Sequence, residues 1–191
     1  MSFVKNLLLR MFGRPKGVLG RLGGIIMART NREIAVRAIE LLDVRPTDKI
    51  LEIGFGPGVG IQLLAGLVSS GRIVGIDDSA EMVEQAGVRN ADAIRAGKVE
   101  LRRDSAECLP FDNDTFDKVL AINSMQVWPE IMAGLRETWR VMKPGSRVVF
   151  GFHTPFRATK RRARRNAYRG RVRRRAHRGY RSGFLRPSDQ T

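Results

Sequence analysis

Residues 31–152 alternate between short apolar runs and longer segments whose apolar residues recur at helical spacing. The short runs predict buried strands, and the periodic segments predict amphipathic helices. Such alternation is typical of a doubly wound α/β fold, in which helices cover both faces of a parallel sheet, and right-handed crossovers favour the strand order 3-2-1-4-5. The predicted strands are residues 49–53, 72–76, 98–101, 116–122 and 147–152. The predicted helices are residues 31–42, 61–70, 80–96 and 130–142. In the last helix, we expect four residues to face inward: Ile131, Leu135, Thr138 and Trp139.

The stretch Lys49–Gly60 changes from an apolar run to alternating glycines. Glu52 lies inside the apolar run, and Gly54, Gly56 and Gly58 follow it at alternate positions. Glycine permits positive φ angles and lets a ligand approach the backbone closely, while the start of the next helix offers unpaired N–H groups. The stretch therefore predicts a strand-to-helix turn that binds a nucleoside-like ligand. A turn without any ligand is the alternative.

The glycine spacing distinguishes between two kinds of nucleotide site. The dinucleotide fingerprint G-x-G-x-x-G needs a third glycine for close helix–strand packing. Val59 or Ile61 occupies that position, depending on which glycine starts the pattern. An acidic residue followed by alternating glycines instead resembles the first motif of the class I S-adenosylmethionine (SAM)-dependent methyltransferases. The resemblance implies a Rossmann-like sheet and SAM as the cofactor.

Acidic residues follow the second and third predicted strands, where ligands bind in open α/β sheets. Asp77 ends the second strand, and its carboxylate can accept hydrogen bonds from both hydroxyls of a ribose; Asp78 is the alternative. The segment Asp104–Phe111 resembles a methyltransferase segment in which the aspartate contacts the adenine amino group. The resemblance implies this role for Asp104, and a backbone N–H contact for Ser105 or Ala106. An acidic surface loop is the simpler interpretation of the same residues.

The segment after the fourth strand resembles the family's fourth motif. It implies that Asn123 hydrogen-bonds the amino-acid part of the cofactor, although a turn cap is the alternative. Met125, Gln126 and Trp128 are candidates for the border of an acceptor pocket, and Trp128 is equally a candidate core residue. The expected cofactor-binding residues are Glu52, Gly54, Gly56, Gly58, Asp77, Asp104, Ser105, Ala106 and Asn123.

The resemblance covers roughly residues 31–152, and the nearest likeness is to methyltransferases acting on small molecules and quinone- or lipid-like acceptors. It implies methyl transfer from a sulfonium to such an acceptor. A strong base is needed only where the acceptor is protonated at the working pH. We assign no catalytic residue, because His153 and His177 lie at or beyond the end of the recognisable domain.

The composition bears on disulfide formation, metal binding and the cellular compartment. The single cysteine, Cys108, excludes an intramolecular disulfide and a multi-cysteine metal site, so we expect no metal. A lone cysteine fits a reducing compartment, and no run approaches the ~18–20 apolar residues of a membrane span. We therefore expect a cytoplasmic protein without a transmembrane segment.

The net charge of +16 is distributed unevenly, and it divides the chain into three parts. Residues 1–30 contain an amphipathic segment, residues 3–12, and a glycine-rich connection. Residues 31–152 are mildly acidic as a whole, whereas residues 153–191 hold 13 arginines and one lysine against a single acid. The segment 3–12 predicts a helix that packs on the domain or, alternatively, makes peripheral contact with a membrane.

The Arg-rich residues 153–191 replace the strands six and seven that the family fold would add to the sheet. They show no apolar stripe or strand alternation, and like charge this dense favours disorder. One interpretation is an arm that binds RNA or another polyanion non-specifically through phosphates, on a vestigial nucleotide-binding body. The other is out-of-frame translation of a GC-rich coding region, which would leave the sheet incomplete and the methyltransferase impaired.

Overall fold

A computed structural model describes residues 32–152 and 168–171. The amphipathic segment 3–12, the glycine-rich connection and both histidines lie outside these residues. The interpretations that depend on them, which are membrane contact and polyanion binding, therefore stay predictions. Among the described residues, no helix is long and apolar enough to cross a membrane.

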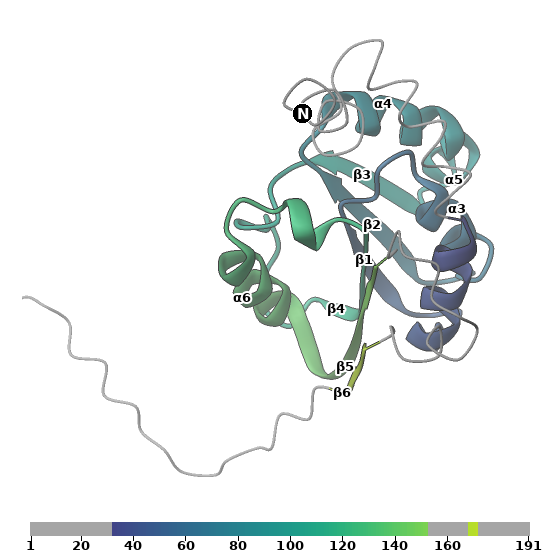
Figure 1. Cartoon of the computed structure of the whole chain (residues 1–191). Helices are drawn as coiled ribbons and strands as arrows, with labels where there is room; N and C mark the ends of the chain where they lie inside the picture. Colours follow the sequence, from purple (N-terminus) through teal and green to yellow (C-terminus); the bar gives the residue numbers. More distant parts are fainter. Residues whose placement is uncertain (1–31, 153–167, 172–191) are drawn as a thin grey trace, which may run out of the picture.

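The predicted parallel sheet is confirmed, with its strands in the order β3-β2-β1-β4-β5 (Figure 1). All four pairings among these strands are parallel. The central strand β1 pairs with β2 on one side and β4 on the other, so the strand order reverses between β1 and β4. The strands are β1 (Lys49–Ile53), β2 (Arg72–Asp77), β3 (Val99–Arg103), β4 (Phe116–Ile122) and β5 (Met142–Gly151).

Helices lie on both faces of the sheet, as Figure 1 shows. A helix over residues 32–42 shares one face with α3 (Val59–Ala65), α4 (Ala80–Arg89) and α5 (Ala91–Arg95). The short 3-10 helix η2 (Met125–Val127) and α6 (Ile131–Val141) lie on the other.

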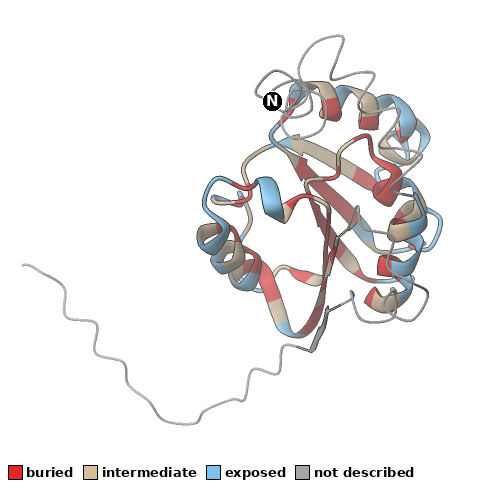
Figure 2. Cartoon of the chain, in the orientation of Figure 1, coloured by how far each residue is buried: buried red, intermediate tan, exposed pale blue. Residues whose placement is uncertain are grey.

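Successive residues of β1 enter two different cores, because side chains alternate across a strand. Ile50 packs with the residues under helix 32–42 and α3, whereas Leu51 packs with those under α6. Figure 2 shows the buried residues concentrated on the central strands. The carboxyl ends of these central strands are thus supported by cores on both faces of the sheet.

Two helices differ from their predicted form. The single helix expected over 80–96 is interrupted at Asn90, whose buried side-chain amide donates hydrogen bonds to the carbonyls of Gly58 (3.1 Å) and Ala86 (2.9 Å). In α6, the expected inward orientation of Ile131 and Trp139 is wrong, since they are 41% and 46% exposed. Thr138 is buried as expected and Leu135 packs against the core, and Gly134 and Val141 are the other buried residues of the helix.

One short strand lies within residues 153–191, a segment in which the sequence predicted no regular structure. Tyr168–Arg171 form β6, which pairs antiparallel with β5 between Arg147 and Phe150. Side-chain alternation does not predict such a strand, because the unpaired N–H and C=O groups of an edge strand can recruit almost any extended backbone. The sheet is therefore six-stranded, with β6 at the edge beside β5.

Candidate functional site

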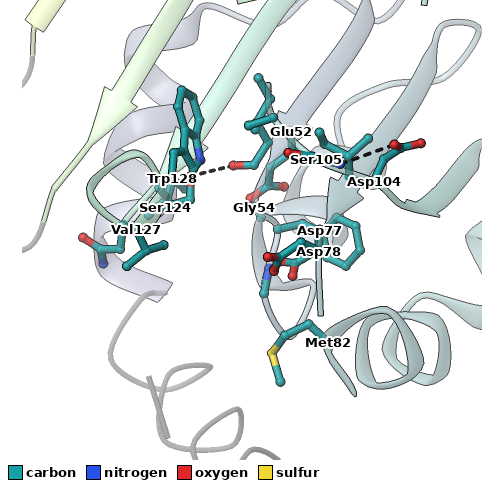
Figure 3. Close-up of a pocket in the computed structure, with 18 of the residues that line it drawn as sticks. Glu52, Gly54, Asp77, Asp78, Met82, Asp104, Ser105, Ser124, Val127 and Trp128 are labelled. Carbon is teal, nitrogen blue, oxygen red and sulfur yellow. Dashed lines mark hydrogen bonds between the residues drawn. The ribbon is translucent and has the colours of Figure 1, made fainter. Parts of the chain in front are cut away.

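A pocket lies at the carboxyl edge of the sheet, around the ends of β1, β2 and β4. Figure 3 shows Ser124, Val127 and Trp128 on one side, and Asp77, Asp78, Asp104 and Ser105 on the other. Eight of the nine expected cofactor residues line the pocket, and Gly58 is the exception. The lining also includes residues that the sequence did not single out as ligands, among them Ala35, Phe55, Gly60, Met82, Ser124 and Pro129.

Gly54 lacks a side chain for two reasons. Its φ angle is +70°, which lies in the region that favours glycine. In addition, a Cβ atom at this position would lie 2.3 Å from Cβ of Ser124. The Ser124 hydroxyl donates a hydrogen bond of 2.7 Å to the Ile53 carbonyl, which joins the ends of β4 and β1. Ser124 therefore fixes the loop at the point where the strand order reverses.

Gly58 acts on the loop from outside the pocket. It is the N-cap of α3, with φ +79°, and an added Cβ would lie 2.7 Å from both Cβ of Ala86 and Nδ2 of Asn90. Asn90 donates to the Gly58 carbonyl, and Nε of Arg89 donates to the Pro57 carbonyl at 2.7 Å. The end of α4 thus holds the glycine loop in place, and Gly58 positions this loop without lining the pocket itself.

Asp77 is fixed by two backbone donors. The Gly56 N–H donates to Oδ2 at 2.8 Å, and the Ser79 N–H donates to Oδ1 at 3.0 Å. Burial raises the pKa of Asp77 to about 6; the two hydrogen bonds oppose this rise and the charge of Asp78 adds to it. The carboxylate is therefore oriented by the glycine loop itself and stays mostly ionised at neutral pH.

Glu52 is the most enclosed acid of the pocket, with 2% of its surface exposed. Its carboxyl group lies against the first turn of α3, where an added Cβ on Gly60 would be only 2.2 Å from Oε1. Among the described residues, Oε2 has no hydrogen-bond partner. Burial, followed by the charge of Asp77, raises the pKa of Glu52 to about 8. Glycine at position 60 is thus required by the acid beneath it, a contact that local sequence spacing does not reveal.

The loop after β3 carries Asp104 and Ser105, which lie on the same side of the pocket as Asp77 (Figure 3). The Asp104 N–H donates to the Asp77 carbonyl at 3.1 Å, and the Ser105 N–H lies 3.3 Å from Oδ1 of Asp104. Glu107 accepts from the Ser105 hydroxyl (2.9 Å) and from the Glu130 N–H (2.9 Å), just before α6. The loop is thereby fixed both to β2 and to the far side of the pocket.

An ion pair within α6 fastens the remainder of this loop. Glu137 accepts from the Leu109 N–H at 2.8 Å, and Arg140 pairs with Glu137 at 2.6 Å. The same guanidinium donates to the carbonyls of Leu109 and Phe111 at 2.8 and 2.6 Å. The segment that resembles the family's adenine-binding motif is therefore held by α6 as well as by the sheet.

The β4 side of the pocket combines polar backbone with an apolar wall. Asn123 has a φ of +51°, and its N–H donates to the Gly151 carbonyl at 2.8 Å. Trp128 is 8% exposed, and its ring meets that of Phe150 edge-on at a centroid distance of 6.4 Å. Trp128 is consequently both a core residue and a pocket residue. Of the predicted acceptor-pocket residues, Met125 and Gln126 are not part of the lining, whereas Trp128 is.

Comparison with known proteins identifies the family. Residues 50–145 match the family model of a methyltransferase domain, which is half of the chain. This chain belongs to the SAM-dependent methyltransferases. A Bacillus subtilis relative, "Uncharacterized methyltransferase YdaC", is 31% identical over 128 residues, covering 67% of this chain and 68% of the relative.

Other relatives carry more specific names. The "Ubiquinone/menaquinone biosynthesis C-methyltransferase UbiE" of Geotalea daltonii is 36% identical over 129 residues. A "Demethylmenaquinone methyltransferase" of Bacillus cereus is 31% identical over 129 residues. These matches cover 66% and 67% of this methyltransferase, respectively. The chain spans only 54% of the length of each of these two relatives.

Solved structures agree on the fold. The YcgJ protein of Bacillus subtilis has a TM-score of 0.55 and 27% identity, covering 62% of this chain and 49% of that protein. A SAM-dependent methyltransferase of Aquifex aeolicus has a TM-score of 0.57 at 21% identity, covering 63% of this chain and 65% of that one. The second likeness shows the fold alone.

The residues that line the pocket of this methyltransferase are chemically compatible with SAM, which carries a positive charge and a ribose diol. Gly54 and Gly56 have no side chains to block close approach to the loop, and Asp77 holds a fixed carboxylate in the lining. Glu52 holds an unpartnered, buried oxygen beside this position. Within the described part of the chain, no group of histidine, cysteine or acidic residues could hold a metal ion.

Proposed function

We propose that this pocket binds SAM and that the protein transfers the methyl group to a small, lipid-like acceptor. The observation that carries the proposal is the Asp77 carboxylate, which is held by backbone N–H groups of the glycine loop and of the start of α4. A diol can then add hydrogen bonds to oxygens that are already oriented. Little rearrangement is needed on binding, so the conformational cost of binding is low.

The other expected residues receive complementary roles in this proposal. Asp104 accepts from the adenine amino group, and the adjoining backbone of Ser105 and Ala106 faces the ring. Asn123 contacts the amino-acid part of the cofactor, and Glu52 faces its positive charge. The positions support these roles, since the residues follow successive strand ends around one pocket (Figure 3).

Bound SAM supplies an already activated methyl group on its sulfonium. The protein therefore needs chiefly to align the acceptor and to exclude water. Trp128 is the apolar wall suited to both tasks, because its ring lines the pocket and is immobilised against Phe150 and Gly134. A side-chain base is required only for an acceptor that is protonated at the working pH.

The choice of acceptor rests on relatives and on this apolar wall. Two of the relatives are named for quinone substrates. Val127, Trp128 and Pro129 form an apolar border to the pocket, which suits a ring or an isoprenoid chain better than a charged metabolite. The proposal therefore names a demethylated quinone or a similar lipid-like ring as the acceptor class.

Calorimetric titration with SAM tests the cofactor assignment. We expect Asp77→Ala to weaken binding at least tenfold, consistent with about 1.4 kcal/mol or more for lost hydrogen bonds to a charged group. We expect Gly56→Val to abolish binding, because it adds bulk at a pocket position with φ +54°. Gly97→Val is the matched control, since Gly97 also has a positive φ, +71°, but has open space around it. A folded wild-type protein that does not bind SAM would refute the assignment.

Transfer of a labelled methyl group tests the acceptor class. We expect incorporation into demethylmenaquinone dispersed in detergent and none into a water-soluble amine. We expect Trp128→Ala to reduce incorporation more than it weakens SAM binding. Labelling of the amine alone would overturn the lipid-like assignment while leaving the cofactor assignment intact.

A further inference from the structure

Every described charged residue that lines the pocket is acidic. β2 contributes Asp77 and Asp78, and the loop after β3 contributes Asp104 and Glu107. Helix 32–42, α3 and the β4 side contribute no charged side chain to the lining. Among the described residues that line the pocket, none is a lysine, arginine or histidine. Among the described residues, Glu52 therefore faces like charge without a compensating cation in the lining.

The position of Glu52 makes its charged form costly in the free protein. It is 2% exposed, its Oε2 atom has no hydrogen-bond partner among the described residues, and its carboxyl group is pressed against the Gly60 backbone. A buried carboxylate without a partner is strongly disfavoured relative to the neutral acid. A positive charge placed beside it reverses that preference, because the low local dielectric strengthens the attraction.

We propose that Glu52 is a cation-responsive proton site, protonated in the free protein and ionised when a positive charge of the methyl donor comes to lie beside it. The inference rests on the proposed function, since it requires the donor to bind in this pocket. The O–H bond of Glu52 breaks, the proton passes to solvent, and the electron pair stays on the carboxylate. Binding of the donor is thus exchanged for release of a proton.

This exchange makes donor affinity depend on pH with a defined sign. The pKa of Glu52 in the free protein is raised to about 8, so donor binding competes with a proton below that pH. Affinity therefore increases as pH rises toward 8, by up to about tenfold per pH unit where a full proton is exchanged. Asp77, with a pKa of about 6, contributes to the same trend only at lower pH.

Calorimetry at pH 7.5 in two buffers of different ionisation enthalpy measures the released protons directly. At that pH, with a pKa of about 8, we expect roughly 0.8 proton per SAM bound. Adenosine, which carries no charge, should release almost none. S-adenosylhomocysteine keeps the ammonium but has lost the sulfonium. Release with that ligand assigns the partner charge to the ammonium, and its loss assigns it to the sulfonium.

Variants separate Glu52 from the rest of the acidic wall. Glu52→Gln should abolish proton release while SAM still binds, whereas Asp78→Asn, which removes an exposed acid of the same wall, should leave the release in place. Buffer-independent heats with a SAM-binding wild type, or undiminished release in Glu52→Gln, would overturn the inference. The wild-type measurement decides even where the variant does not fold, and a failure of SAM to bind contradicts the proposed function instead.

Discussion

At the residue scale, the contact between Glu52 and Gly60 restricts position 60 to glycine. A Cβ there would lie 2.2 Å from Oε1 and 2.6 Å from Oε2 of Glu52. We expect Gly60→Ala to lower the free energy of unfolding by about 1–3 kcal/mol through overpacking. Gly87→Ala is the matched control within α4, where nothing lies within 4 Å of an added Cβ. It should instead stabilise the protein by about 0.5–1 kcal/mol. Urea denaturation of both variants measures the difference, and equal effects would show that the contact is unimportant.

The raised pKa of Glu52 also predicts how the stability of the ligand-free protein depends on pH. Folding raises the pKa of Glu52 from 4.5 to about 8, so the folded state binds more protons than the unfolded state between these values. This contribution to stability is fully present below about pH 4.5 and is lost as pH rises through 8.

Relative to Glu52→Gln, we therefore expect the wild-type free energy of unfolding to fall by on the order of 3 kcal/mol from pH 5 to pH 8. Urea titrations at several pH values test this. Parallel pH profiles for the two proteins would contradict it.

At the residue scale, the sequence predicted the position of a residue correctly where that position follows from a strand end. Asp77, Asp104 and Asn123 each follow a predicted strand, and the structure places all three in one pocket. Ser124 and Gly60 were not predicted as site residues, because their roles depend on contacts with Gly54 and Glu52 across the sheet. Periodicity alone does not report such contacts.

At the scale of elements, α4 connects the two halves of the candidate cofactor site. Its N-cap is Ser79, which lies beside Asp77. Its C-cap is Asn90, whose side-chain amide donates a hydrogen bond to the Gly58 carbonyl. We expect Asn90→Ala to cost about 1–3 kcal/mol of stability, since it removes two buried side-chain hydrogen bonds. It should also weaken SAM binding, because the glycine loop loses a fixed anchor.

Arg95→Ala is the control for this prediction. Arg95 is an exposed residue of α5 that pairs with Asp92 on the surface, so its loss should change stability by less than about 1 kcal/mol. Thermal unfolding and calorimetry with SAM on both variants provide the comparison. Unchanged SAM affinity in a folded Asn90→Ala protein would show that α4 does not position the loop.

The element boundaries show where sequence patterns are insufficient. The strand Phe116–Ile122 was predicted with its observed limits, because its apolar run is bounded by polar residues. The interruption of the helix at Asn90 was not, since its cause is a hydrogen bond to a loop 32 residues away. The inward orientation of α6 was mispredicted for Ile131 and Trp139 only. The close approach of Trp128 to Gly134 is a contact that helical periodicity does not report.

At the scale of the whole molecule, the sheet ends in a strand that its own sequence does not specify. β6 pairs antiparallel with β5, with Val148 opposite Gly170 and Val149 opposite Arg169. Without β6, the backbone N–H and C=O groups of β5 on that side would form an open edge. An open apolar edge strand favours pairing with another chain.

Truncation after residue 152 tests this arrangement. We expect the shortened protein to keep the pocket, because every described lining residue lies between Ala35 and Pro129. We expect it to lose stability and to self-associate through β5 at micromolar concentration, as sedimentation velocity would measure. A truncated protein that stays monomeric and equally stable would show that β6 does not protect the sheet. In that case the Arg-rich residues serve some purpose other than completing the fold.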